Sequence, residues 1–410
     1  MNVRLRIALL TAAVVATAAY LAWQSSSYWS GDYPVEAGPV IDSLIHGKLG
    51  DFLGGRPLMG PLSLLLRAPF AALSLISGGG DKVDMYDAAY RFGVFPCALF
   101  GGALGLTLFA LAERLGRSPL VKYGALIVCT INPLTVKALT YGHPEEIIGG
   151  ALLVGAMLAA IYERALMASI LLAAAIATKQ WAILGLPAVL IVLPWQKVRR
   201  PLIVLAGVGL LILIPIVAAD PGSFVRVNSH LLDVRTGNVL PTSVWWPFTS
   251  ATGASGGIVH HSPDLIGLGA HPLIIVLSLA LPLALRKYVR RDVLTRALPL
   301  LALVLLIRCM FDPVDNSYYH LPFYLALIAA DVVAGSLAPA LVATAAFVLI
   351  IDLPTHPTAQ ALIYIIWSLA FAVHLLGRTC GRDWLRVRSR DARVRAAAAP
   401  QRPSSSAARS

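Results

Sequence analysis

The chain has 410 residues, of which 58% are hydrophobic and only 13% are charged. This composition excludes an ordinary soluble globular protein and predicts an all-α polytopic membrane protein. The net charge of +12 does not indicate nucleic-acid binding, because the basic residues fall in short loops between apolar segments. The four cysteines are widely scattered and show neither a disulfide framework nor a zinc-binding spacing.

About twelve transmembrane helices are predicted from apolar runs in the sequence. They cover residues 7–23, 92–111, 121–139, 147–161, 165–177, 182–193, 202–219, 265–285, 297–307, 321–334, 337–351 and 361–376. The first run follows Arg4 and Arg6, as in a signal peptide, but its length and the spans after it favour an uncleaved helix. Residues 57–76 are apolar yet carry Arg67 and three prolines, which predicts interfacial helices in the first outer loop and not a further span.

The orientation follows from the basic loops, which come after the second, fourth, sixth, eighth and twelfth predicted spans. The positive-inside rule therefore places both termini in the cytoplasm of a multi-pass protein of the cell membrane. Residues 1–380 are expected to form one membrane domain. The Arg-, Ala-, Ser- and Pro-rich residues 381–410 are expected to form a disordered basic cytoplasmic tail. Six polar segments then meet on the outer face, which predicts a site in a cavity open to the outside.

The sequence YGHPEE at 141–146 places an imidazole and two carboxylates at a predicted membrane boundary. Charged groups are costly there and often functional. Pro144 suits the first position of a helix, where Glu145 and Glu146 complement the helix dipole. A position at the start of a helix explains one carboxylate, but it does not explain why two carboxylates cluster with His143. A divalent metal is the alternative, but no fixed ligand set supports it, so we expect neither a metal nor a cofactor.

Three acids lie in or near the first outer loop, namely Asp32, Glu36 and Asp42. They are either solvated loop carboxylates or the source of a general base that takes a proton from an attacking hydroxyl. Asp32 stands just past a helix end, at the height of a lipid headgroup. Lys179 and Arg308 stand at the outer ends of spans. Snorkelling explains either cation alone, but two cations facing several acids indicate a bound phosphate.

Other polar side chains on this face are predicted to bind substrate. These are Gln180, Trp181, Asp312, Tyr318, Tyr319 and His320. The turn that begins at Asp312 also has a structural interpretation, because Asn316 or Ser317 can cap the helix that follows. We further expect Trp245 and Trp246, in the long outer loop, to close over the substrates.

Three motifs resemble a known family. GHPEE at 142–146, TKQWA at 178–182 and DPVDNSYYHLPF at 312–323 resemble actinobacterial membrane glycosyltransferases of the GT-C superfamily, near glycosyltransferase family 87. The resemblance implies a polyprenyl-phosphate-linked sugar donor, often mannose, and inverting transfer outside the membrane to a lipid or glycan hydroxyl. It also implies a catalytic base in the first outer loop, which points to Asp32. Many GT-C enzymes carry a tighter acidic pair there, so Glu36 and Asp42 stay open as alternatives.

The hypothesis is thus a metal-independent glycosyltransferase with Asp32 as the base. Lys179, Arg308 and His143 are expected to stabilise the leaving phosphate, while Glu145 and Glu146 orient His143 or sugar hydroxyls. A twelve-span transporter is the main rival, but its sites should lie near the bilayer midplane between repeated halves, and no repeat is visible. A non-catalytic membrane subunit that binds lipid-linked glycans is the third interpretation.

Overall fold

The computed structural model describes residues 3–26, 32–54, 60–77, 82–222, 225, 235, 237–254, 257–352 and 356–381. The predicted disordered tail beyond residue 381 and part of the first loop, residues 27–31, lie outside the described residues. In the described part the chain is helical except for one two-stranded sheet. This confirms the all-α class expected from composition.

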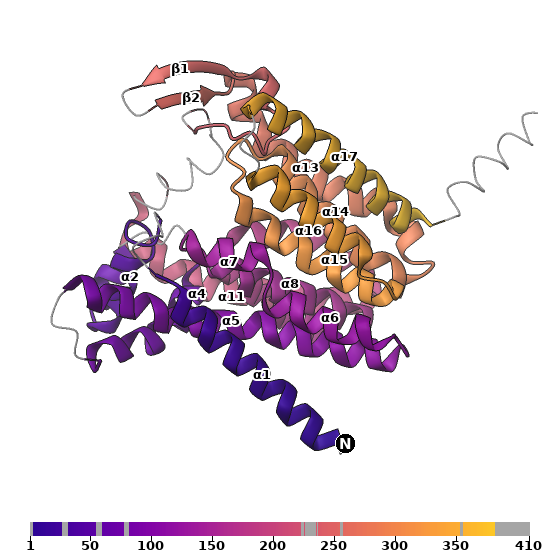
Figure 1. Ribbon diagram of the computed structural model, residues 1–410, viewed down its shortest axis with the longest axis horizontal. Helices are drawn as coiled ribbons and strands as arrows, with labels where there is room; N and C mark the ends of the chain where they lie inside the picture. The colour runs from indigo at the N-terminus through magenta and orange to yellow at the C-terminus, as the bar shows by residue number, and fades with distance from the viewer. Residues whose placement is uncertain are drawn as a thin grey trace, which may run out of the picture.

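The first half of the chain is built from helices joined by short connections (Figure 1). Those described are α1 (Val3–Gln24), α2 (Gly38–Ile45), α3 (Leu49–Gly54), α4 (Pro61–Ala71), η1 (Ala72–Leu75), α5 (Lys82–Arg114), α6 (Pro119–Thr130), α7 (Pro133–Thr140), α8 (Glu145–Ile161), α9 (Ala165–Thr178), η2 (Gln180–Gly185), α10 (Leu186–Val192) and α11 (Trp195–Ala219).

The second half adds a β-hairpin and a further group of helices. Its described elements are η3 (Trp246–Phe248), β1 (Ser250–Ala254), β2 (Gly257–His261), α13 (Asp264–Val289), α14 (Val293–Phe311), η4 (Ser317–His320), α15 (Leu321–Ala334), α16 (Ala338–Asp352) and α17 (Pro357–Cys380). The strands pair antiparallel, with Ser250 opposite His261. This hairpin was not predicted from the sequence.

Seven helices in the described part are long and apolar enough to cross a membrane. They are Arg4–Gln24, Met85–Arg114, Pro119–Thr140 (α6 and α7 taken together), Trp195–Ala219, Asp264–Val289, Val293–Phe311 and Pro357–Cys380. Each of the twelve predicted apolar segments lies on helix, but several of these helices are shorter, such as α9 and α16. The structure is therefore consistent with an all-α membrane protein, while twelve crossings remain a prediction.

One predicted span is divided into two helices. Asn132 separates α6 from α7, and its side-chain oxygen accepts hydrogen bonds from the backbone N–H groups of Leu134 and Thr135, both at 2.9 Å. Pro133 follows at the first helical position, where its missing N–H costs nothing. The cap starts a new short helix, α7, which ends at Thr140, three residues before His143.

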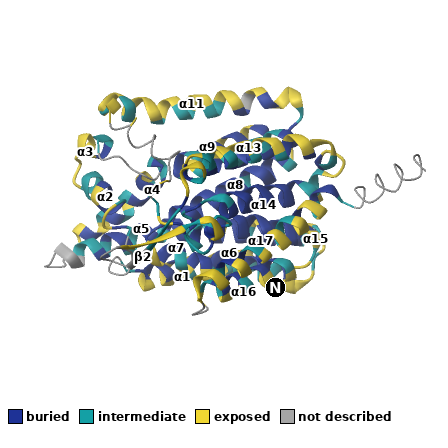
Figure 2. Cartoon of the chain, turned by 90° about the horizontal axis from the view of Figure 1, so that it is seen from above, coloured by how far each residue is buried: buried dark blue, intermediate teal, exposed yellow. Residues whose placement is uncertain are grey.

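The core centres on α8, α14 and α15, which are buried nearly all round (Figure 2). A helix that is apolar on every side is unsuited to water and is covered by other helices or by lipid. By contrast, α11 lies at the edge of the bundle and exposes much of its surface. The two acids at the start of α8, Glu145 and Glu146, are thereby brought into the protein interior.

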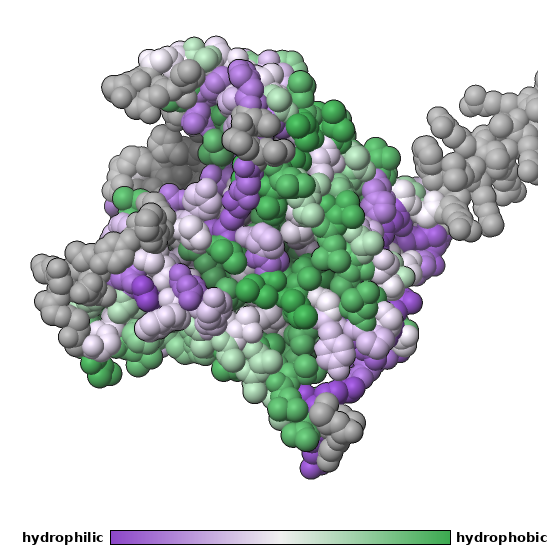
Figure 3. Space-filling model, viewed as in Figure 1, coloured by the Kyte–Doolittle hydropathy of each residue, from purple (hydrophilic) through white to green (hydrophobic). Residues whose placement is uncertain are grey.

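Hydrophilic residues gather towards opposite ends of the bundle, with hydrophobic surface between them (Figure 3). At one end, ion pairs join Arg6 to Glu113 at 2.7 Å and Lys197 to Glu163 at 2.7 Å. These pairs link the start of α1 to the end of α5, and the start of α11 to the connection between α8 and α9. The opposite end holds the start of α8.

The two tryptophans of the long loop hold the hairpin region against the helices. Trp245 donates a 2.7 Å hydrogen bond from Nε1 to the carbonyl of Phe311, at the end of α14. Trp246 stacks on His260 of β2, with ring centroids 3.9 Å apart. Both side chains thus have a structural role in this conformation, and their predicted closure over a substrate remains untested.

A close backbone approach fixes the start of α4 beside the end of α9. The Gly60 N–H donates a 3.1 Å hydrogen bond to the carbonyl of Thr178. A Cβ atom at Gly60 would lie 2.1 Å from the carbonyl oxygen of Ala177. Only glycine fits this contact, which sets the position of the chain immediately before Lys179.

We expect Gly60→Ala to lower the free energy of unfolding by about 1–3 kcal/mol, because the added methyl group must push two backbone segments apart. Gly50→Ala is the matched control, since a Cβ at Gly50 in α3 meets nothing within 4 Å. Thermal unfolding of the detergent-solubilised variants, followed by tryptophan fluorescence, measures the difference. Equal stability of the two variants would contradict the proposed close contact.

Candidate functional site

Segments far apart in the sequence converge at the end of the bundle where α8 begins. Asp32 precedes α2, His143 joins α7 to α8, and Lys179 follows α9. Arg308 belongs to the last turn of α14, and Tyr318 lies in η4. These five positions were predicted from the sequence to share one face, and in the structure they form a single cluster of contacts.

His143 lies at the centre of this cluster, between two carboxylates. Its Nδ1 is 2.7 Å from Oε1 of Glu145, and its Nε2 is 2.9 Å from Oδ2 of Asp32. A neutral imidazole has only one N–H, whereas the imidazolium has two. Because both nitrogens face carboxylate oxygens, the geometry favours the positively charged form, which can donate to both acids.

The electrostatics of His143 agree with this assignment. Burial alone would lower the pKa of the imidazole, but the charge of Glu145 and the hydrogen bonds to Asp32 and Glu145 raise it to about 9. The ring also stacks on Tyr318, with centroids 4.4 Å apart. His143 is therefore a fixed cation that joins the first loop to the start of α8.

The backbone before His143 explains why its side chain turns inward. Gly142 has a φ of +90°, a left-handed conformation that favours glycine. This turn ends α7, and the His143 N–H donates back to the carbonyl of Ala138 at 2.8 Å. The chain then enters α8 with Glu145 and Glu146 in its first turn, as predicted from Pro144. Their side chains go beyond a capping role, because they bind other charged groups.

Lys179 and Arg308 neutralise these two glutamates. Lys179 Nζ is 2.8 Å from Oε1 of Glu145 and 3.9 Å from Oε1 of Glu146. Arg308 Nη2 is also 3.9 Å from Oε1 of Glu146. Trp181 Nε1 donates to the same oxygen at 3.1 Å. The cations predicted to hold a phosphate are thus paired with carboxylates, a pairing that their sequence positions did not indicate.

Aromatic rings hold the Arg308 guanidinium in place. Its central carbon lies 4.8 Å from the Trp181 ring centroid and 4.4 Å from that of Tyr319. Arg308 also donates a 3.2 Å hydrogen bond to the carbonyl of Tyr319. A planar guanidinium suits such stacking, which an ammonium group cannot reproduce. Trp181 and Tyr319 therefore belong to the cluster through Arg308 and Glu146, and their role in substrate binding stays a prediction.

Exposure divides the cluster into an accessible carboxylate and a buried support. The side chain of Asp32 is 41% exposed, against 5% for His143 and none for Glu145. Burial raises the pKa of nearby Glu36, although the charges of His143 and Lys179 oppose that effect. Asp32 is thus the acid of the cluster that another molecule can reach while it is held by a buried cation.

One buried cation was not predicted to belong here. Arg67 of α4 is fully buried, and its guanidinium lies 5.3 Å from the Tyr33 ring centroid and 5.9 Å from that of Tyr90. None of its three nitrogens has a hydrogen-bond partner among the residues that the structure describes. Its charge stabilises the carboxylate of Glu145. Arg67 therefore supports Tyr33, the neighbour of Asp32, from inside the protein.

Three predicted site residues have other surroundings. Gln180 is exposed. Asp312 accepts a 3.0 Å hydrogen bond from the Val314 N–H within its own turn. His320 is fully buried, and its Nε2 lies 3.1 Å from the hydroxyl of Tyr364.

The expected side-chain cap by Asn316 or Ser317 is wrong, because Asn316 precedes η4 without such a bond.

His320 belongs instead to a second buried group with Cys309 and Asp315. One ligand atom from each lies within 4.8 Å of the others, so this is where the described part of the chain could hold a metal ion. Tyr364 is 3.4 Å from Oδ2 of Asp315 as well as 3.1 Å from His320. These hydrogen bonds join Asp315 and His320 through Tyr364, while Asp315 Oδ1 and His320 Nδ1 have no hydrogen-bond partner among the described residues.

Comparison of the sequence with protein-family models and with curated proteins found no match. The interpretation of the site therefore depends on its own geometry.

Glu145→Gln is expected to destabilise the protein by about 3–5 kcal/mol, because it leaves His143 and Lys179 without their shared buried counter-charge. The control is Glu163→Gln, which breaks the exposed pair with Lys197 and should cost less than about 1 kcal/mol. Chemical unfolding in detergent micelles measures both. Similar small losses would show that the Glu145 carboxylate is not the counter-charge on which the cluster depends.

The raised pKa of His143 also predicts a pH dependence. The folded value of about 9 lies above the ordinary 6.5, so the stabilisation by His143 is complete below pH 6.5 and is lost as the pH rises through 9. We expect the unfolding temperature of the native protein to fall over this interval more steeply than that of His143→Gln. Parallel pH profiles for the two proteins would contradict a charged His143.

Proposed function

We propose that the protein is a membrane glycosyltransferase that transfers a sugar, such as mannose, from a polyprenyl-phosphate donor to a hydroxyl of a lipid or glycan. The observation that supports this most is the series of contacts from Asp32 through His143 and Glu145 to Lys179. A half-exposed carboxylate is held by a buried imidazolium, which is itself held by a buried ion pair. A general base needs this combination of access and fixed orientation.

In the proposed reaction, Asp32 accepts the proton of the acceptor hydroxyl. The acceptor oxygen forms a bond to the anomeric carbon as the bond from that carbon to the phosphate oxygen breaks. The electron pair of the broken bond leaves on the polyprenyl phosphate, and the attack from the opposite face inverts the anomeric configuration. His143 stays hydrogen-bonded to one oxygen of Asp32, and the carboxylate retains other lone pairs that can accept from the incoming hydroxyl.

The negative charge that develops on the leaving phosphate needs nearby cations. Lys179 has three N–H donors and Arg308 has five, so each can bind a phosphate oxygen without releasing its glutamate. Glu145 and Glu146 hold these cations in advance of the reaction, which avoids reorganisation as the charge forms. Trp181, stacked on Arg308, provides an aromatic surface next to the same groups.

The proposed setting is the extracytoplasmic face of the cell membrane, because the cluster lies at the end of the bundle opposite the basic connectors. A transporter of a polar or anionic solute and a non-catalytic glycan-binding subunit are the competing hypotheses. A transport site is expected near the middle of the spans, whereas this cluster lies where several helices begin or end.

We expect Asp32→Asn to reduce sugar transfer on the order of 10²–10⁴-fold, because the amide cannot accept the proton. Asp42→Asn is the matched control: Asp42 is also a first-loop acid, but it pairs with the exposed His46 at 3.3 Å. Its activity should stay near that of the native protein. The measurement is transfer from radiolabelled polyprenyl-phosphate mannose in proteoliposomes.

Unchanged turnover in Asp32→Asn would overturn the assignment of the base, and Glu36→Gln would then be tested in the same assay. Absence of transfer by the native protein across several donor sugars, combined with uptake of a solute, would favour the transporter. Donor binding without turnover would favour the non-catalytic subunit.

A further inference from the structure

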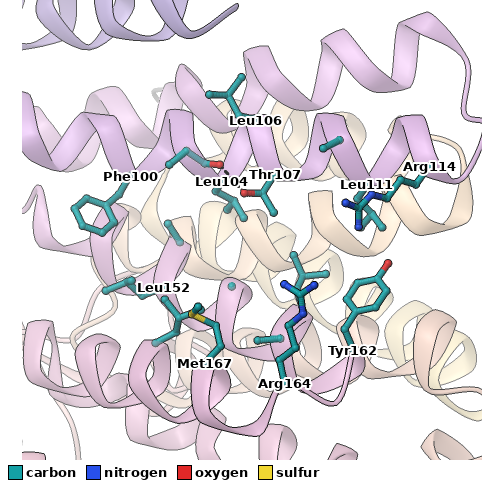
Figure 4. Close-up of a pocket in the computed structure, with 17 residues that line it drawn as sticks. Phe100, Leu104, Leu106, Thr107, Leu111, Arg114, Leu152, Tyr162, Arg164 and Met167 are labelled. Carbon is teal, nitrogen blue, oxygen red and sulfur yellow. Dashed lines mark hydrogen bonds between the residues drawn. The ribbon is translucent and has the colours of Figure 1, made fainter. Parts of the chain in front are cut away.

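A groove of about 680 Å³ lies between α5, α8 and α9, away from the charged cluster (Figure 4). Its walls are apolar over most of their length, with Phe100 and Leu152 at one end. At the other end Arg114, Tyr162 and Arg164 surround the same space. The volume falls within the range of about 300–1,000 Å³ that is usual for ligand sites.

The groove arises from small residues in the helices that line it. Ala151, Gly155 and Ala159 of α8 follow one another at four-residue intervals, so three small side chains form the floor. The facing side of α5 carries Ala103 and Thr107, which are exposed within the groove. Larger residues at these positions would fill the space. The groove is therefore a consequence of helix packing and does not depend on a loop.

The charge at the basic end has no counter-charge in the described part of the protein. Glu113 and Glu163 each precede one of the two groove arginines, but they pair with Arg6 and Lys197. Neither Arg114 nor Arg164 forms an ion pair with a described acid, and both side chains are exposed. Two guanidinium groups and a tyrosine hydroxyl thus face one space that contains no acid among the described residues.

The length of the groove suits one leaflet of a membrane. On α5 the lining extends from Phe100 to Arg114, and at about 1.5 Å per residue this is roughly 21 Å. One half of a hydrocarbon core is about 15 Å thick. The basic end lies beside the connection between α8 and α9, among the other basic connectors. An apolar chain in the groove would therefore place its headgroup level with the arginines.

We propose that this groove binds an anionic phospholipid, with an acyl chain along α8 and the headgroup phosphate between Arg114 and Arg164. Guanidinium groups bind phosphate through paired, charge-assisted hydrogen bonds, and Tyr162 supplies a further donor. A zwitterionic lipid has the same chains but a phosphate already neutralised by its own amine. A soluble phosphate has the charge but lacks the chain that the apolar walls accommodate.

The test is native mass spectrometry of the full chain in detergent, titrated with phosphatidylglycerol, phosphatidylcholine or glycerol phosphate. We expect phosphatidylglycerol to bind more tightly than either of the others. The double variant Arg114→Gln/Arg164→Gln should weaken its binding on the order of tenfold to thirtyfold, because each arginine near an anionic headgroup contributes to affinity. The control is Arg286→Gln/Lys287→Gln, which removes two positive charges at the end of α13 and should leave the affinity unchanged.

A second variant tests the apolar part of the groove. Ala110→Trp places a large ring at an exposed lining position, so it should weaken phosphatidylglycerol binding while both arginines remain. Equal binding of phosphatidylglycerol and phosphatidylcholine, or equal losses in the two double variants, would overturn the proposal. Tight binding of glycerol phosphate would assign the arginines to a soluble anion. None of these measurements depends on sugar transfer.

Discussion

The carboxylate of Glu145 is the group on which the charged end of the protein depends. It is fully buried at the start of α8, and its Oε1 binds both a protonated imidazole and a lysine ammonium. A buried charge without such partners would cost several kcal/mol, so His143 and Lys179 cannot be separated from it cheaply. Because His143 also binds Asp32, the position of the first loop is determined by the same carboxylate. One buried acid thus links three separate segments of the chain.

The arrangement of α8 connects the two sites proposed for this protein. Its first turn carries the acids of the charged cluster, where the positive end of the helix dipole favours negative charge. Its middle provides the small side chains of the groove floor, and the chain that follows its last turn leads to Arg164. An apolar helix that is buried by its neighbours can therefore carry opposite charges at its two ends without burying either of them unpaired.

Hydropathy and the placement of basic residues were sufficient to predict the helical class and the segments that form helices. They also predicted that Asp32, His143, Lys179 and Arg308 approach one another. The pairing of each acid with a particular base could not be predicted, because Asp32 and His143 are 111 residues apart and meet only through packing. Arg67 was assigned to an interfacial helix, because a lone arginine in an apolar segment gives the same sequence pattern at the membrane interface and inside the protein. The hairpin was missed because Gly-rich strands alternate too weakly to detect.

The sequence separation within the cluster bears on biosynthesis. Glu145 and Glu146 leave the ribosome before the lysine and arginine that neutralise them, and Lys179 follows Glu145 by 34 residues. A helix whose first turn carries carboxylates that lack some of their cationic partners enters a membrane less readily than one whose charges are already paired. The segment from the start of α8 to Lys179, just after α9, is therefore the shortest part of the chain that contains both Glu145 and its lysine. It is a natural unit of insertion into the membrane. Arg308 can join Glu146 only after most of the bundle has been made.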